Sequence, residues 1–209
     1  MCDLCCCCCC SGGPGAPWNS VNFGLRKLTT EAERRRLHRF FATKLDRNRG
    51  GTIELHEMLE YFEVEETPLT LALFGYFDAD GSGSLTFREF SLHMYNFLTL
   101  EKEGLHRFVF RLHDRDCNGR LATNEVEGLV RDAFGSAKMG DKMQKVMSGS
   151  DMKKKASLNE DEFLELVRRS PNLLYPIANL QMNMQRRCLG TRFWRRHTKV
   201  RSKYADSDA

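Results

Sequence analysis

The chain has 209 residues, of which 41% are hydrophobic, and a formal net charge of +4. This length is sufficient for two small packed lobes, and no apolar run reaches the roughly 18–20 residues that a membrane-spanning helix needs. The composition therefore excludes a helical membrane-spanning protein and is typical of a small helical protein.

The N-terminal segment, residues 1–27, combines a cluster of cysteines with a stretch rich in Ser, Gly and Pro. It lacks the basic start and the long apolar stretch of a secretory signal. Clustered terminal cysteines resemble those of multiply S-acylated proteins, because two acyl chains, or one chain with a polybasic segment, hold a protein at a membrane. We expect S-acylation here, with thiolate metal or redox chemistry and an unmodified tail as alternatives. The candidate lipidation sites are Cys2, Cys5, Cys6, Cys7, Cys8, Cys9 and Cys10.

A helix is predicted to begin after Thr30 and to run into a first loop at Asp46. Thr30 and Glu33 have the spacing of a capping box, and apolar side chains follow at helical spacing. Oxygen-bearing residues then recur at alternate loop positions, which suits Ca²⁺ because this ion takes six to eight oxygen ligands at about 2.3–2.6 Å. Gly50 offers no side-chain oxygen at the fifth position, so we expect a water there and weaker binding. The candidate ligands are Asp46, Asn48, Thr52 and Glu57.

The second loop, residues 78–89, has the most complete pattern. Gly83 stands at the sixth position, where the backbone must turn sharply, and Glu89 stands at the twelfth, where a carboxylate can bind the ion with both oxygens. Apolar residues at helical spacing flank the loop on both sides. The candidate ligands are Asp78, Asp80, Ser82, Ser84 and Glu89.

The third loop, residues 114–125, repeats this frame, and a fourth copy is degenerate. Arg120 at the seventh position of the third loop is tolerated because that position coordinates through its backbone carbonyl. In the fourth copy, Lys153 and Lys155 stand at chelating positions and Ala156 replaces the turn glycine, so we expect no calcium there. The candidate ligands of the third loop are Asp114, Asp116, Asn118, Arg120 and Glu125.

The four loops begin at Asp46, Asp78, Asp114 and Asp151, so the repeat is 32, 36 and 37 residues long. That period and these loops resemble the EF-hand proteins of the calmodulin superfamily, and in layout the calcineurin B-like and neuronal calcium sensor proteins. The resemblance implies an all-α fold with two lobes of paired helix-loop-helix units, at 28–99 and 100–170. It also implies a short antiparallel ribbon in each lobe, pairing Ile53 with Leu85 and Leu121 with Leu158, and two to three bound Ca²⁺ ions.

The C-terminal extension, residues 171–209, is predicted to contain a basic amphipathic helix from Tyr175 to Trp194. Residues 186–209 carry a net charge of +6, whereas the preceding 185 residues carry −2. A basic amphipathic helix is typical of a membrane-surface segment or of a mimic of a target helix. Three arrangements remain open: the segment folds back into the protein's own groove, lies on an anionic membrane surface, or is a solvated tail. Nucleic acid is not expected as a partner, because no base-reading module accompanies the charge.

These features predict a calcium sensor that regulates a partner protein by binding an amphipathic helix of that target, which is a kinase or phosphatase in one reading. We expect it in the cytoplasm, held peripherally at a membrane by its acylated cysteines. A regulatory subunit of a phosphatase or kinase and a calcium buffer are the alternatives. Catalytic activity is not expected, because the six histidines are scattered without an evident nucleophile or metal-ligand spacing.

Overall fold

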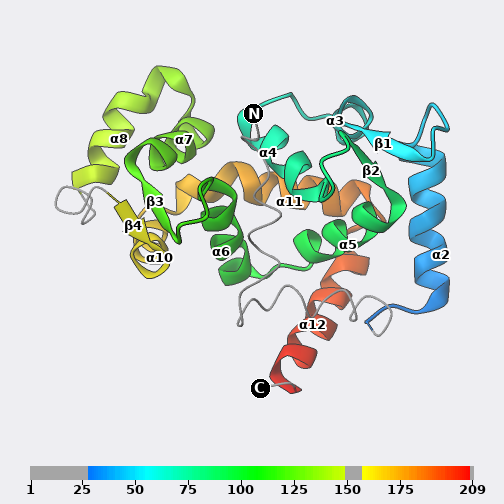
Figure 1. The fold of residues 1–209 in the computed structure, drawn as a ribbon. Helices are drawn as coiled ribbons and strands as arrows, with labels where there is room; N and C mark the ends of the chain where they lie inside the picture. The colour runs from blue at the N-terminus through cyan, green and yellow to red at the C-terminus, as the bar shows by residue number, and fades with distance from the viewer. Residues whose placement is uncertain (1–27, 149–156, 208–209) are drawn as a thin grey trace.

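The computed structural model describes residues 28–148 and 157–207. Within these ranges the chain is built from helices and two short two-stranded antiparallel ribbons (Figure 1). The predicted all-α fold with paired EF-hand lobes is therefore confirmed. The cysteines of the N-terminal segment and the interior of the fourth loop lie outside the described residues.

The N-terminal lobe contains the first two helix-loop-helix units. Its elements are α2 (Glu31–Phe40), the π-helical turn η2 (Phe41–Leu45), β1 (Thr52–Glu54), α3 (Leu55–Phe62), α4 (Pro68–Phe77), β2 (Ser84–Thr86) and α5 (Phe87–Leu98). The predicted capping box is present at the start of α2: the Thr30 backbone N–H donates to Glu33 Oε2 at 2.8 Å, and the Glu33 backbone N–H donates to Thr30 Oγ1 at 3.3 Å. These bonds satisfy backbone donors that the first helical turn leaves without partners.

The C-terminal lobe repeats this plan. Its elements are α6 (Lys102–His113), β3 (Arg120–Ala122), α7 (Thr123–Phe134), the 3₁₀ turn η3 (Ser136–Lys138), α8 (Met139–Ser148), β4 (Ser157–Asn159) and α10 (Glu160–Arg169). β1 pairs with β2, and β3 pairs with β4. Ile53 lies opposite Leu85 and Leu121 opposite Leu158, as predicted. All four of these side chains are fully buried, so the ribbons fix both the spacing of the loops and their attachment to the core.

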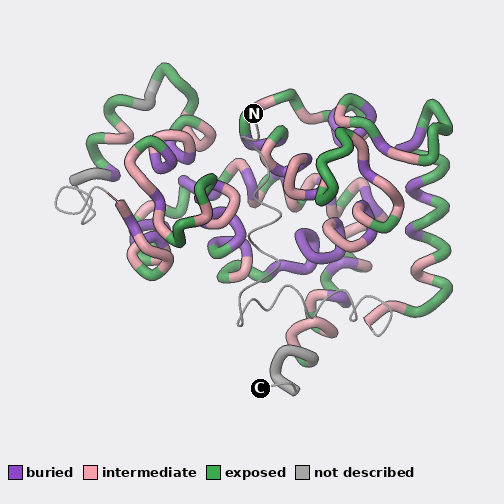
Figure 2. The backbone as a smooth tube through the Cα atoms, viewed as in Figure 1, coloured by how far each residue is buried: buried purple, intermediate pink, exposed green. Residues whose placement is uncertain are grey.

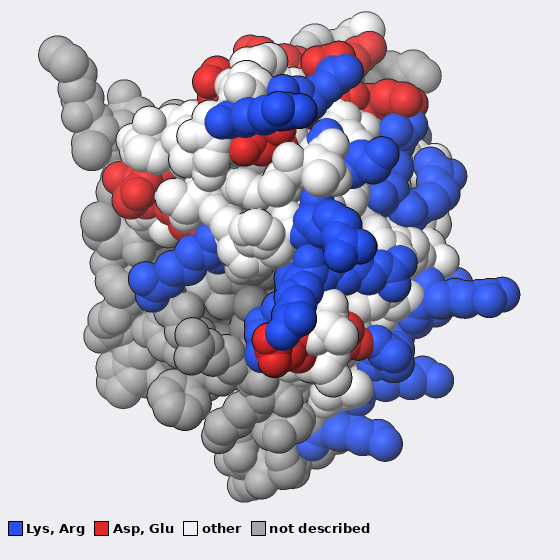
Figure 3. Space-filling model, turned by 90° about the vertical axis from the view of Figure 1, so that its right-hand side faces the viewer, with Lys and Arg blue, Asp and Glu red and all other residues white. Residues whose placement is uncertain are grey.

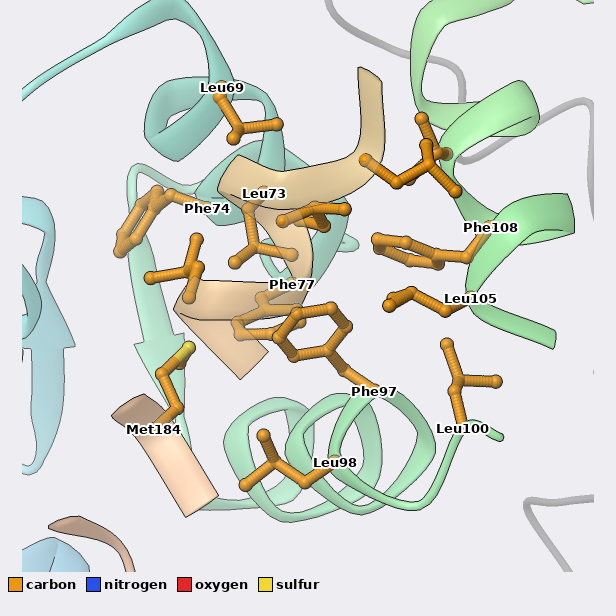
Figure 4. Close-up of a cluster of buried hydrophobic side chains, with 14 of the residues drawn as sticks. Leu69, Leu73, Phe74, Phe77, Phe97, Leu98, Leu100, Leu105, Phe108 and Met184 are labelled. Atoms are coloured by element: carbon orange, nitrogen blue, oxygen red, sulfur yellow. The ribbon is translucent and has the colours of Figure 1, made fainter. Parts of the chain in front are cut away.

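Buried hydrophobic side chains of both lobes form one continuous cluster. In the close-up of Figure 4, Phe77 of α4 and Phe97 of α5 lie beside Leu105 and Phe108 of α6, which belongs to the other lobe. Figure 2 shows the buried stretches on the faces that the helices turn toward one another. The two lobes therefore share packing, and the hydrophobic effect that stabilises one also holds it against the other.

The C-terminal extension forms two helices rather than one. After the turn η4 (Pro171–Leu174), α11 runs over Tyr175–Arg187 and α12 over Thr191–Ser207. The continuous helix predicted from Tyr175 to Trp194 is therefore interrupted at residues 188–190. Leu189 and Gly190 have φ angles of 63° and 88°, a left-handed conformation that ends a right-handed helix. The indole N–H of Trp194 donates to the carbonyl of Cys188, which holds the turn from inside the core.

The helix α11 packs against the protein's own lobes (Figure 1). Its Ile177, Leu180 and Met184 are buried, and Figure 4 shows Met184 directed at the side chains of the core cluster. Of the three arrangements considered for the extension, packing against the protein's own helices is the one that this structure has. The amphipathic pattern of α11 is thus accounted for by an internal contact.

Candidate functional site

The second loop is closed by the carboxylate of Glu89, which stands in the first turn of α5. Its Oε1 accepts the backbone N–H groups of Ala79 at 3.1 Å and Asp80 at 3.3 Å, while Oε2 accepts the backbone N–H of Thr86 at 3.0 Å. One side chain therefore connects the beginning of the loop to its end. Because Glu89 belongs to α5, the position of that helix depends on where this carboxylate is held.

The front half of the same loop turns around two further carboxylates. Asp78 accepts the backbone N–H of Ser82 at 3.0 Å and that of Gly83 at 2.8 Å, and Asp80 accepts the Ser82 N–H at 3.0 Å. Gly83 has a φ of 80°, a value that glycine adopts without steric cost. The Ser82 hydroxyl donates to the carbonyl of Ser84 at 2.9 Å, so that carbonyl faces the loop.

The third loop has the same construction. Glu125 accepts the backbone N–H of Arg115 at 2.8 Å with one oxygen and that of Ala122 at 2.9 Å with the other. Asp114 accepts the N–H groups of Asn118 at 3.1 Å and Gly119 at 3.0 Å. Asp116 also accepts the Asn118 N–H, at 3.1 Å, and the Asn118 side-chain amide, at 2.7 Å.

The first loop reproduces this geometry with fewer carboxylates. Glu57 accepts the backbone N–H groups of Arg47 at 3.0 Å and Glu54 at 3.0 Å, and Asp46 accepts those of Gly50 at 2.8 Å and Gly51 at 2.9 Å. Asn48 Oδ1 accepts the Gly50 N–H at 2.6 Å. A side chain on Gly50 would place its Cβ 2.8 Å from that oxygen. The fifth position thus lacks a ligand oxygen, as the sequence indicates, because glycine has no side chain.

The second and third loops each have three carboxylates, and each set is suited to binding one cation. Asp78, Asp80 and Glu89 each place one oxygen within 4.8 Å of the others, and Asp114, Asp116 and Glu125 do the same. Oxygens bound at about 2.3–2.6 Å to a common Ca²⁺ lie at most about 5 Å apart. The donor sets are hard oxygens throughout, which Ca²⁺ prefers and softer metals do not. The residues present therefore fit calcium.

Burial and backbone hydrogen bonds have opposite effects on the loop carboxylates. Burial raises the pKa of Glu57, but hydrogen bonds from the Glu54, Asn48 and Arg47 backbones outweigh it, so the pKa lies below its ordinary value. For Asp114 burial prevails over the Gly119 and Asn118 backbone donors, and its pKa is raised. Asp114 is thus a carboxylate whose ionised form gains from a nearby positive charge.

The degenerate fourth hand retains the glutamate at its twelfth position, Glu162, and this side chain lies beside a residue of the third loop. Glu162 accepts the Asn159 backbone N–H at 2.9 Å and lies 3.9 Å from the Arg120 guanidinium. Arg120 Nε also donates to Ser157 Oγ at 2.8 Å. The side chain of Arg120, which the sequence analysis considered only as tolerated at a position that binds through its carbonyl, therefore crosses the ribbon and places a positive charge beside the carboxylate of the fourth hand.

Sequence reasoning also missed how α11 holds the two exit helices of the N-terminal lobe. The side-chain amides of Gln181 and Gln185 each donate to α5 at 2.7 Å, to the carbonyls of Phe97 and Leu98 respectively. The Asn183 amide donates to the carbonyl of Phe62 in α3 at 2.8 Å. Carbonyls in the last turn of a helix have no partner within it, and α11 supplies donors to the ends of both α3 and α5. The Phe97 carbonyl also accepts the Leu100 N–H at 3.3 Å. The signal in the sequence is the alternation of amide side chains along a basic helix.

Paired helix-loop-helix units with oxygen-lined twelve-residue loops are the arrangement found in EF-hand proteins of the calmodulin superfamily, which this chain resembles. Curated proteins to which the chain is similar include calcineurin B subunits. The chain is 28% identical to the calcineurin B subunit of Schizosaccharomyces pombe over 130 residues, which cover 59% of this chain and 74% of that protein. It is 28% identical to the type 2 calcineurin B subunit of Rattus norvegicus over 141 residues, covering 65% and 80%. It is 30% identical to the calcineurin B subunit of Naegleria gruberi over 109 residues, covering 51% and 60%.

No family model matches the chain. Among the described residues, none of the helices combines the length and the apolar character that crossing a membrane requires.

Proposed function

We propose that this protein is a calcium sensor that regulates a partner protein and has no catalytic activity of its own. The observation that carries the proposal is that Glu57 and Glu89 each close a calcium-type loop from the first turn of an exit helix, while α11 holds the far ends of the same two helices. A change at either loop is thereby connected to the C-terminal extension.

The proposed ligands are the fourteen residues named from the sequence, and two to three ions are expected to bind. A bound Ca²⁺ supplies a divalent charge that the loop oxygens share. Glu57 and Glu89 would hold the ion with the carboxylates that now accept backbone N–H groups, so α3 and α5 would shift with them. Because α3 and α5 are rigid, their C-terminal carbonyls move with them, and the amide contacts from α11 are weakened. The apolar surface that Ile177, Leu180 and Met184 of α11 now cover, called here the groove beneath α11, then becomes available to an amphipathic helix of a target protein.

A second candidate function is that of a calcium-binding regulatory subunit of a phosphatase or kinase. The relatives' name favours it, since each is named as the B subunit of calcineurin. The same exposed groove would serve, with a catalytic chain as the partner. A calcium buffer is a weaker candidate, because a buffer has no use for an extension attached to both exit helices.

Titration of the full chain with Ca²⁺ in the presence of a hydrophobic dye tests the sensor function. We expect dye fluorescence to rise as calcium saturates the loops, because apolar side chains beneath α11 become exposed. A parallel Ca²⁺ titration of the Glu57→Gln/Glu89→Gln/Glu125→Gln variant controls for binding outside the loops. Calcium binding with no change in dye fluorescence would support a buffer and contradict the sensor.

We further propose that acylation of Cys2 and Cys5 to Cys10 places the protein at a membrane. These residues lie outside the described ranges, so the proposal rests on the sequence and on the need for more than one lipid chain. Hydroxylamine cleaves thioesters and is expected to shift the protein from the membrane fraction to the supernatant. A variant with serine at these seven positions should be found in the supernatant from the start. Retention of the hydroxylamine-treated protein on membranes would contradict the proposal.

A further inference from the structure

A pocket of about 760 Å³ lies where α2, α5 and α12 meet. Leu37 of α2, Tyr95 of α5 and Trp194 of α12 form its floor, and these side chains are at most 6% exposed. The half-buried Phe87 and Phe193 also line the pocket. Its volume and aromatic lining are those of a site that receives an apolar group. The pocket does not include the contact between α11 and the lobes.

The rim of the pocket is positively charged. Arg34, Arg35 and Arg88 line it, and Glu33 is its only acidic lining residue among those that the structure describes. The Glu33 carboxylate already accepts the Thr30 N–H and faces Arg196 and His197. The negative charge of Glu33 is therefore already paired within the protein, and the rim of the pocket retains a net positive charge.

The surroundings extend this positive potential. Arg192 and Arg195 are exposed on α12, the helix that contributes Phe193 and Trp194 to the pocket. Figure 3, in which the right-hand side of Figure 1 faces the viewer, shows Lys and Arg side chains gathered over this face of the molecule. Each guanidinium carries five N–H donors, so Arg35 can bind a further carboxylate beside its contact with Glu31.

A basic surface of this kind could bind an anionic membrane or an acidic protein segment, and the depth of the pocket distinguishes the two. A membrane surface is bound by apolar side chains that project into the bilayer beside the basic residues. Here the apolar side chains form a sunken floor and the arginines stand above it. We infer that this pocket binds an acidic, amphipathic peptide segment of a partner protein, with an apolar side chain inserted between α2 and α12 and its carboxylates on the arginine rim.

The position of the pocket connects it to the calcium loops. α2 leads into the first loop and α5 leaves the second, so the distance between two walls of the pocket depends on both loops. This dependence rests on the proposed function. Binding of the peptide itself does not, because the pocket is present in the structure as described.

Tryptophan fluorescence provides the test. The chain has two Trp residues, so Trp18→Phe leaves Trp194, in the pocket floor, as the single reporter. The probe is a synthetic peptide of about 18 residues, helical over its length, with Leu and Phe on one face and Glu on the other, titrated in EDTA and in Ca²⁺. A peptide with Lys in place of each Glu is the control. We expect the acidic probe to change the Trp194 emission, and the basic control to have no effect.

Two charge reversals on α2 distinguish binding in the pocket from attraction to the positive charge of the whole protein. Arg35→Glu, on the rim, should weaken binding of the acidic probe about fivefold. Arg39→Glu makes the same change on α2 outside the pocket lining and should have little effect. Equal losses in the two variants would overturn the inference. So would binding of the wild-type chain to phosphatidylserine vesicles that Arg35→Glu weakens, without any binding of the acidic probe. If calorimetry finds no bound calcium, the proposed sensor function is wrong. The peptide titration in EDTA still shows whether the pocket binds the acidic probe.

Discussion

Replacing Met184 with aspartate is expected to lower the free energy of unfolding by about 3–5 kcal/mol. Met184 is 1% exposed and belongs to the continuous hydrophobic cluster, so the change removes buried apolar contacts and places a carboxylate where water cannot reach it. Met182, two residues earlier on the same helix, is 57% exposed. Met182→Asp should therefore change the stability by less than about 0.5 kcal/mol.

Urea denaturation of both variants in EDTA measures this difference. If α11 detaches before the lobes unfold, Met184→Asp should also bind hydrophobic dye without calcium, because the groove beneath α11 is then exposed. Met182→Asp should match the wild type in both measurements. Equal stability of the two variants would mean that α11 does not lie against the core, and would remove the connection between the extension and the exit helices.

Replacing Glu89 with glutamine is expected to weaken the second site to about the millimolar range, where the weakest calcium-binding loops lie. The substitution removes one ligand oxygen and one negative charge from the ion's surroundings. The amide oxygen of glutamine can still accept the N–H groups of Ala79 and Asp80, whereas its amide nitrogen cannot accept the Thr86 N–H that Oε2 now accepts. The calcium-free fold should persist with this one loop bond lost. Calorimetry should find one fewer ion at micromolar calcium, and circular dichroism in EDTA should be unchanged.

The fourth hand contains the matched control. Glu162 occupies the same twelfth position and caps the start of α10 as Glu89 caps α5. Since no ion is expected in its loop, Glu162→Gln should leave the number of bound ions unchanged. An ion lost from Glu162→Gln, or none lost from Glu89→Gln, would show that the sites are assigned to the wrong loops.

The paired loops could be predicted from the sequence because their determinants are local. A carboxylate at the first position, a glycine at the sixth and a glutamate at the twelfth fix the course of one loop, and the hydrophobic eighth residue fixes its pairing. The register of Ile53 with Leu85 depends on nothing further along the chain. The capping box at Thr30 is predictable for the same reason.

The features that could not be predicted depend on contacts distant in sequence. The end of α11 is not among them, because Gly190, with a φ of 88°, is a local signal at which helices commonly end. The amide contacts from α11 join residues more than 80 positions apart. Arg120 looks like a surface charge until the ribbon brings Ser157 beside it. In each case tertiary packing selects a partner that the local pattern does not specify.

Calorimetric titration of the full chain with Ca²⁺ determines whether these loops hold calcium. We expect two to three ions to bind in the sensor range of about 10⁻⁷–10⁻⁵ M, with the first loop the weakest because Gly50 supplies no ligand oxygen. Binding should disappear in the Glu57→Gln/Glu89→Gln/Glu125→Gln variant. No heat of binding in this range, or the same binding in that variant, would contradict the claim that these three loops hold calcium.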